Sequence, residues 1–260
     1  GHFKLRGEEK NKIIHQLSTG VPLDVTSSKL LPNGSKKYSV GDLITGYGVC
    51  ESVVHFYNIY GGELKNKRVI IQGWGNVAAT AAYYLAQEGA IVVGIIDKNG
   101  GLINKNGFSF DKISQLLENR SENYLEDQEI KSFEEINNNI WKVGAEIFIP
   151  AAASRLITNQ NLEKMIKNNL EVISCGANVP FADKEIFFGP IAKKADEQVS
   201  LIPDFISNCG MARTFSYLME KNIEMNDFAI FEAVSKTIFD ALKDTFNKNS
   251  SKKNIAKTAF

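Results

Sequence analysis

Short apolar runs alternate with helical patterns along most of the chain. Five runs rich in branched apolar side chains are typical of buried strands: residues 66–73, 91–97, 145–152, 170–178 and 199–205. Helical patterns occupy residues 76–90, 108–120 and 41–60, the last with a predicted start near Thr45. Strands that alternate with helices predict an α/β protein of the Rossmann type, whose doubly wound, mostly parallel sheet has helices on both faces.

Three segments lack a clear period. Residues 19–42 are rich in Ser, Gly, Pro and Lys and predict a loop with at most short strands. Residues 98–107 carry two turn signals around one short strand-like piece, and residues 121–139 are charged and rich in Asn. The regular alternation of strands and helices is therefore expected from about Val40 onwards.

Composition excludes several classes of protein. The 30 Lys and Arg residues equal the 30 Asp and Glu residues, so the chain lacks the basic field that a nucleic-acid or acidic-membrane partner requires. No apolar run approaches the ~20 residues that span a bilayer, and the first residues lack the apolar core of a signal peptide. The three widely spaced cysteines indicate buried thiols rather than disulfides or a metal site. We expect a cytoplasmic protein without nucleic-acid, membrane or metal partners.

A glycine-rich turn follows the first predicted strand of the regular region. It reads Gly73-Trp74-Gly75-Asn76-Val77-Ala78, a G-x-G-x-x-A pattern. Gly73 allows a sharp turn out of the strand, Gly75 lets the backbone approach a pyrophosphate, and Ala78 lets the helix lie against the sheet. The free N–H groups and the dipole at the start of this helix favour phosphate groups. The pattern predicts a turn that binds a dinucleotide.

An acidic residue ends the second predicted strand. Asp97 lies 24 residues after Gly73, near the ~20 expected of the carboxylate that binds the adenosine ribose of a dinucleotide. A carboxylate there can accept hydrogen bonds from both ribose hydroxyls and repels a 2′-phosphate, so Asp97 favours NAD over NADP. Lys98 could receive that phosphate, which leaves NADP as the alternative. The competing interpretation is a strand-to-helix turn that binds no ligand, with Asp97 solvated.

Six motifs carry a resemblance to a known family. They are STGVPLDVTSSKLLPNGSKKYSVGDLITGYGV at 18–49, QGWGNVA at 72–78, IIDKNGGLINKNGF at 95–108, IPAAAS at 149–154, CGANVP at 175–180 and PDFISNCGMART at 203–214. In this order they resemble the cofactor domain of the Glu/Leu/Phe/Val amino-acid dehydrogenase family. The resemblance implies oxidative deamination of an L-amino acid such as glutamate to a 2-oxo acid and ammonia, with hydride passing from the substrate Cα to the nicotinamide.

The resemblance also implies roles that spacing alone does not single out. Thr45 is expected to reach the nicotinamide carboxamide, and Asn178 and Asn208 to lie beside the nicotinamide and its ribose. Residues 76–77 are expected to line the pyrophosphate turn, and residues 151–152 to lie near the adenosine ribose. The complete set of expected cofactor-binding residues is Thr45, Gly73, Gly75, Asn76, Val77, Asp97, Lys98, Ala151, Ala152, Asn178 and Asn208.

Simpler interpretations stay open for several polar residues. Asn178 follows Gly-Ala and could be only a turn residue, and Asn208 could cap the helix that follows it. Asp204 is expected to be a cap or turn residue rather than a catalytic acid. Trp74 is expected to pack in the interior, although its place within the turn would also allow contact with the cofactor.

The resemblance covers only part of the family's architecture. We expect a lead-in segment at 1–40 with a tag remnant at 1–2, the NAD(P)-binding domain at 41–220 and a truncated helical segment at 221–260. We expect the family's N-terminal substrate domain, which carries its catalytic lysines and aspartate, to be missing from this sequence. No catalytic residue is therefore expected on this chain, which should bind NAD but catalyse no reaction alone. The full-length protein, expected to be a homo-oligomer, would take a dinucleotide and an amino acid.

Two positions depart from the family pattern. Arg213 introduces a charge where the family usually has none, and Phe215 is bulky where glutamate-specific members tend to carry a small hydroxyl residue. These departures motivate an alternative function, an NAD-binding sensor or interaction module that has lost the dehydrogenase chemistry. A third interpretation is another two-domain dehydrogenase with a similar cofactor domain.

Overall fold

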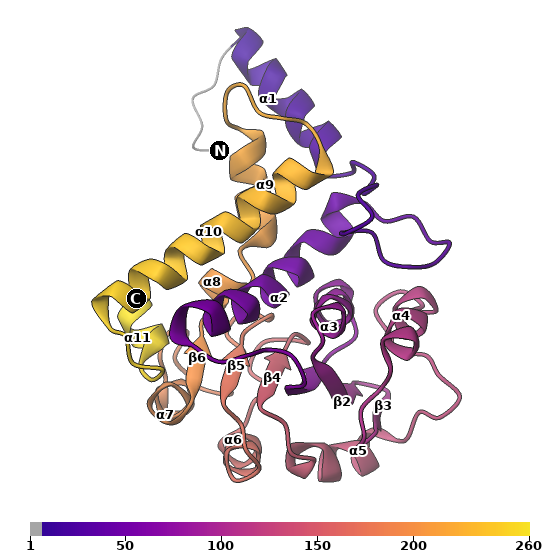
Figure 1. Ribbon diagram of the computed structural model, residues 1–260, viewed down its shortest axis with the longest axis vertical. Helices are drawn as coiled ribbons and strands as arrows, with labels where there is room; N and C mark the ends of the chain where they lie inside the picture. Colours follow the sequence, from indigo (N-terminus) through magenta and orange to yellow (C-terminus); the bar gives the residue numbers. More distant parts are fainter. Residues whose placement is uncertain (1–6) are drawn as a thin grey trace.

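A six-stranded sheet lies at the centre of residues 7–260, the part of the chain that the computed structural model describes (Figure 1). The strands are β1 (Arg68–Gln72), β2 (Ile91–Asp97), β3 (Gly100–Ile103), β4 (Ile147–Pro150), β5 (Val172–Ser174) and β6 (Ser200–Ile202). Their order is β3-β2-β1-β4-β5-β6, with β3 antiparallel to β2 and the other neighbours parallel. The predicted mostly parallel sheet is confirmed.

Helices cover both faces of this sheet (Figure 1). On one face lie α2 (Val40–Tyr60) and α3 (Asn76–Gln87), with α4 (Phe110–Glu118) packed beside α3 and α10 (Asp227–Lys248) packed on α2 in the same buried cluster. The other face packs against α5 (Phe133–Asn139), the 3-10 helix η1 (Ile140–Lys142), α6 (Asn159–Ile166) and α7 (Pro190–Gln198). The remaining helices are α1 (Gly7–Gly20), α8 (Asp204–Ser207), α9 (Gly210–Leu218) and α11 (Ile255–Ala259).

The central strands are apolar on both sides because each side meets a helical layer. In β1 the side chains of Val69 and Ile71 belong to one buried cluster, and that of Ile70 belongs to the other. Successive side chains of a strand point to opposite faces, so a strand covered on both faces needs a continuous apolar run. This explains why residues 66–73 could be recognised as a strand from sequence.

The second helix begins one turn earlier than predicted. It starts at Val40 after the N-cap residue Ser39, and the Asp42 carboxylate accepts hydrogen bonds from Ser39 N at 2.9 Å and Ser39 Oγ at 2.7 Å. The expected start near Thr45 is therefore wrong, and Thr45 lies in the second turn. The S-x-x-D sequence is a capping-box type signal that apolar spacing alone overlooks.

Two helices occupy segments in which the sequence pattern predicts none. The helix α1 lies in the lead-in segment, where Gln16 Nε2 donates to Leu218 O at 2.9 Å. The helix α5 begins where Ser132 Oγ accepts from Glu135 N at 3.3 Å. The tag remnant expected at 1–2 lies outside the described residues. Between residues 7 and 260, no helix combines the length and the apolar character needed to cross a membrane.

Glycines bring α2 into close contact with its two neighbours. A Cβ built on Gly46 would lie 1.8 Å from Thr80 Oγ1 of α3 and 2.7 Å from Val77 O. A Cβ built on Gly48 would lie 3.3 Å from the Ile238 side chain of α10. The T-G-x-G sequence thus lets α2 pack tightly between α3 and α10, and it fixes the position of Thr45.

Replacing Gly46 by alanine should therefore destabilise the protein. The new methyl group would force α2 and α3 apart, and such overpacking costs about 1–3 kcal/mol, beyond the higher helix propensity of alanine. Chemical denaturation would measure the loss of unfolding free energy. The matched variant Gly41→Ala, whose Cβ meets the tip of Val21 at 3.3 Å, should change it by less than about 1 kcal/mol. Equal effects of the two variants would contradict the packing argument.

Candidate dinucleotide-binding site

A cavity of about 700 Å³ opens at the carboxyl ends of β1, β2 and β4. β1 is flanked by β2 on one side and by β4 on the other, so the chain leaves the sheet in opposite directions there. Open α/β sheets bind ligands at such a switch point. The cavity brings together eight of the expected residues: Gly73, Gly75, Asn76, Val77, Asp97, Lys98, Ala151 and Ala152.

The first glycine of the turn is required by its backbone and by its neighbours. Gly73 has φ +98°, and a Cβ there would lie 2.8 Å from both Ala151 O and Ala152 Cα. Gly73 N donates to Ile96 O at 2.7 Å, which ties the turn to the end of β2. Only glycine combines this backbone conformation with such a close approach.

The start of α3 offers uncommitted backbone donors to the cavity. Its N-cap is Gly75, no side chain within residues 7–260 caps it, and its first turn carries no acidic residue. Asn76 and Val77 line the cavity, and a Cβ on Gly75 would meet only Asn123 Oδ1 at 3.6 Å. Amides at a helix start, without a carboxylate to satisfy them, form an anion site.

Trp74 does not block this cavity. Its side chain is fully buried in the core, and its Nε1 donates to Leu116 O of α4 at 3.3 Å. The predicted packing role is confirmed by this burial. The indole lies between the turn and α4, so it packs against the turn from the interior of the protein.

The Asp97 carboxylate is fixed by two backbone donors. Its Oδ1 accepts from Lys98 N at 2.8 Å and its Oδ2 accepts from Leu125 N at 3.1 Å. The side chain is buried apart from a small exposed fraction at the cavity wall. A carboxylate oxygen can accept more than one hydrogen bond, so each can still accept from a ligand hydroxyl.

Lys98 points to a neighbouring aromatic residue. Its Nζ donates to the Tyr124 hydroxyl at 3.0 Å and lies 4.2 Å from the centre of the Tyr124 ring. The hydrogen bond to Tyr124 raises the pKa of Lys98. The ammonium group remains exposed to solvent beside Asp97, where it can approach an anionic group.

The other expected residues lie beyond the cavity lining but form a continuous neighbourhood with it. Asn208 Nδ2 donates to Asn178 Oδ1 at 2.8 Å. A Cβ on Gly176 would lie 2.7 Å from Ala151 Cβ, and one on Gly210 would lie 2.8 Å from Thr45 Cα. The loops after β5 and β6 therefore connect the cavity to the second turn of α2.

The side chains of Asn208 and Asp204 both bond to the loop after β5. Asn208 does not cap α9, because Cys209 is the N-cap and the Asn208 side chain bonds to the loop after β5. Asp204 acts on backbone amides, as a cap or turn residue does. Its Oδ1 accepts from Phe205 N and its Oδ2 accepts from Val179 N, both at 2.8 Å.

Sequence reasoning missed one wall of the cavity. Beyond the eight expected residues and the adjoining Gln72 and Trp74, the lining residues are Ile96, Asn123, Tyr124, Phe133, Asn137, Trp141, Ala153, Leu156 and Asn161. Several come from residues 121–139, which have no clear period. The aromatic residues Tyr124 and Phe133 inside that polar stretch were the available signal, because exposed rings are suited to a planar ligand.

Both residues that depart from the family pattern lie outside the cavity, and Arg213 has local partners. Arg213 Nε donates to Thr237 Oγ1 at 3.0 Å and its Nη1 donates to Glu220 Oε1 at 2.7 Å, so the charge joins α9 to its surroundings. The Phe215 side chain is 44% exposed. Neither residue belongs to the lining of the cavity.

The cysteines match the prediction of buried thiols for two of the three. Burial raises the pKa of the Cys50 and Cys175 thiols well above the usual value, while Cys209 is half-buried. Within residues 7–260 there is no group of three or more His, Cys, Asp or Glu side chains that could hold a metal ion.

Known proteins share this fold and sequence pattern. The NADP-specific glutamate dehydrogenase of Saccharolobus shibatae is 29% identical over 95% of this chain and 52% of its own length. The glutamate dehydrogenase of Aeropyrum pernix is 31% identical over 64% of this chain and 37% of its own. The chain thus spans about half the length, or less, of these relatives.

Solved structures agree on the fold. The Plasmodium falciparum glutamate dehydrogenase superposes with a TM-score of 0.66 at 17% identity, over 84% of this chain and 48% of that one. The hetero-hexameric glutamate dehydrogenase of Thermus thermophilus gives 0.64 at 18% identity, over 84% and 50%.

A family model decides the relationship. The model described as Glutamate/Leucine/Phenylalanine/Valine dehydrogenase matches residues 39–258, which include the glycine turn, Asp97 and both asparagine loops. The match extends beyond the six motifs, since it also covers α10 and most of α11. The chain belongs to the Glu/Leu/Phe/Val dehydrogenase family.

Proposed function

We propose that residues 41–220 form the cofactor-binding domain of an amino-acid dehydrogenase and that the cavity binds NAD. The observation that carries this proposal is the meeting of three features in one cavity. These are the close turn at Gly73, the uncapped start of α3 and the Asp97 carboxylate. A dinucleotide needs a turn whose backbone it can approach closely, free N–H groups for its phosphates and a carboxylate for its ribose hydroxyls.

The proposal assigns parts of the cofactor to parts of the site. The pyrophosphate lies at the start of α3, the adenosine ribose lies between Asp97 and residues 151–152, and the nicotinamide lies toward Thr45, Asn178 and Asn208. When bound, the nicotinamide supplies the hydride acceptor. The chain itself supplies orientation, which removes much of the entropic cost of the reaction.

The substrate and the assembly follow from the family. The full-length protein would deaminate an L-amino acid such as glutamate, because the relatives named above are glutamate dehydrogenases. One structural relative is a hetero-hexamer, which supports an oligomeric state for the full-length protein. We propose that this oligomer consists of identical chains and is cytoplasmic. The catalytic groups for deamination would belong to a separate substrate domain.

A sensor or interaction module is the second candidate function. The charge at Arg213 motivated it, but the local partners of Arg213 weaken that reason. Assays of the full-length protein against a panel of amino acids distinguish the two functions. Cofactor binding without any deamination would favour the sensor.

The isolated chain should bind NADH and turn over no amino acid. Isothermal titration would measure binding, and absorbance of NADH would measure deamination. Absence of binding at millimolar NAD(H) and NADP(H) would contradict the first expectation. Measurable deamination by the chain alone would contradict the second.

Replacing Gly75 by alanine should separate cofactor binding from folding. Gly75 has φ −72° and room for a Cβ, so the unfolding midpoint should not change. The methyl group would occupy the space that a pyrophosphate needs, so the Kd for NADH should rise by about tenfold or more. Unchanged affinity would show that no pyrophosphate approaches this turn.

Replacing Asp97 by serine should shift the cofactor preference toward NADP. The loss of a charge-assisted ribose contact should weaken NAD binding about tenfold, while NADP gains relative to NAD because repulsion of its 2′-phosphate disappears. Titrations with both cofactors would measure the ratio. Asp111→Ser, at an exposed position in the first turn of α4, is the control and should leave the ratio unchanged. If Asp97→Ser leaves both affinities unchanged, Asp97 does not bind the ribose.

A further inference from the structure

The short helix α8 is bonded to the loop after β5 through its own side chains and the residue that follows it. The bonds run from Val179 N to Asp204 Oδ2 (2.8 Å), from Ser207 Oγ to Cys175 O (2.6 Å), and from Asn208 Nδ2 to Asn178 Oδ1 (2.8 Å) and Gly176 O (3.3 Å). We call these four bonds the clamp between α8 and the loop after β5. The clamp surrounds Asn178, which lies near the nicotinamide in the proposed function.

One residue of the clamped loop has an unfavourable backbone conformation. Val179 has φ +46°, and it is the sole β-branched residue with positive φ among residues 7–260. The left-handed region is costly for β-branched residues. Pro180 follows, and a residue before proline prefers the extended region. The surrounding structure must therefore impose this conformation on Val179.

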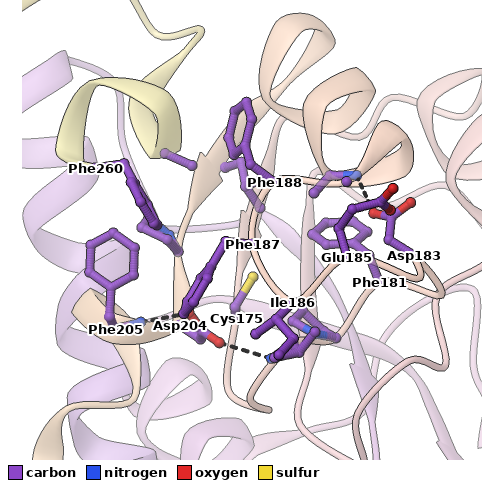
Figure 2. A pocket seen from close by; sticks show the side chains of 17 residues that line it. Cys175, Phe181, Asp183, Glu185, Ile186, Phe187, Phe188, Asp204, Phe205 and Phe260 are labelled. Carbon is purple, nitrogen blue, oxygen red and sulfur yellow. Dashed lines mark hydrogen bonds between the residues drawn. The ribbon is translucent and has the colours of Figure 1, made fainter.

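Two hydrogen bonds impose this conformation, one to each of the two peptide groups that flank the Cα of Val179. Val179 N donates to the Asp204 carboxylate, and Val179 O accepts from Arg155 N at 2.8 Å. The second oxygen of Asp204 accepts from Phe205 N at 2.8 Å, so the carboxylate itself cannot rotate freely (Figure 2). A charged acceptor makes a stronger bond to a backbone N–H than a neutral one does.

Apolar side chains border this carboxylate. Asp204 lies at a small cavity of about 60 Å³ together with Phe187, Phe205 and Phe260, and the rings of Phe205 and Phe260 are 5.9 Å apart (Figure 2). No feature of this small cavity suggests a ligand for Asp204 itself.

We propose that Asp204 is a positioning residue for the nicotinamide half of the cofactor. Its carboxylate keeps Val179 in the left-handed conformation, and this turn presents the Asn178 side chain toward Asn208 and the cofactor. The inference rests on the proposed dinucleotide function. Without the carboxylate, the loop relaxes toward negative φ at Val179 and displaces Asn178, although the rest of the cavity keeps its shape.

The strain in the loop can be tested without any cofactor. Val179→Gly removes the left-handed penalty, so it should raise the unfolding midpoint or leave it unchanged, against the usual cost of glycine. The matched variant Val143→Gly changes a half-buried valine with φ −69° and should lower the midpoint. Equal lowering by the two variants would overturn the strain argument.

The positioning role is tested by comparing NADH with ADP, which lacks the nicotinamide and its ribose. Asp204→Ala should raise the Kd for NADH about tenfold, the factor that corresponds to the left-handed penalty, and leave the Kd for ADP within about twofold. In a Val179→Gly background the same substitution should cost less than about threefold, because glycine adopts the turn without help.

The control for this test is a carboxylate in the same small cavity. Asp183 accepts from Ile191 N at 2.9 Å and Ala192 N at 3.0 Å, so Asp183→Ala removes a similar pair of bonds at the start of α7. It should lower the unfolding midpoint and leave both affinities unchanged.

Failure of the proposed function and failure of the positioning role give different results. If the unchanged protein binds neither NADH nor ADP, the proposed function fails, and the positioning role fails with it, while the unfolding comparison still decides the strain argument. If NADH binds but Asp204→Ala weakens ADP equally, or weakens NADH equally in both backgrounds, the positioning role is overturned and the proposed function stands.

Discussion

The contact between the turn after β1 and the backbone after β4 determines the candidate site. Because β1 lies between β2 and β4, the connections on its two sides diverge and leave a crevice at the carboxyl ends of the strands. Gly73 closes the floor of that crevice, since its missing Cβ lets Ala151 O approach to a distance that any side chain would prevent. The amides of α3 and the carboxylate of Asp97 can share one cavity only while this turn stays tight.

The opposite end of the site is built by distant segments and depends on packing. The loop after β5 contacts Ala151, and the segment that starts α9 contacts Thr45, whose position follows from the glycine contact between α2 and α3. The clamp between α8 and the loop after β5 adds hydrogen bonds, of which the bond from Val179 to Asp204 opposes a backbone penalty. This end therefore has a conformation that the chain would not adopt locally, and strain of this kind is common at functional sites.

The sequence predicted the parts whose signals are local. The strands β1 and β2, the turn from Gly73, α3 and Asp97 lie within about thirty consecutive residues, and each has its own period, small residue or charge. The start of α2 was misplaced because apolar spacing says nothing of a cap at Ser39. The wall around Tyr124 and the bond between Asp204 and Val179 escaped prediction because both arise from tertiary contacts: Leu125 N reaches Asp97 across 28 residues, and Val179 N reaches Asp204 across 25.

This difference between the two ends bears on how cofactor preference and reactivity can change separately. The proposed adenosine end is made by β1, α3 and β2 together with residues 123–125 and 151–152, and its carboxylate is oriented by backbone amides, which a substitution at Lys98 or Tyr124 leaves in place. The proposed nicotinamide end is held by bonds to the side chains of Asp204 and Asn208, so single substitutions there would alter its geometry directly. In the proposed binding mode, recognition of the ribose and its 2′ position can therefore vary without moving the hydride acceptor. The geometry at the acceptor would depend on a few carboxylate and amide groups far from the glycine turn.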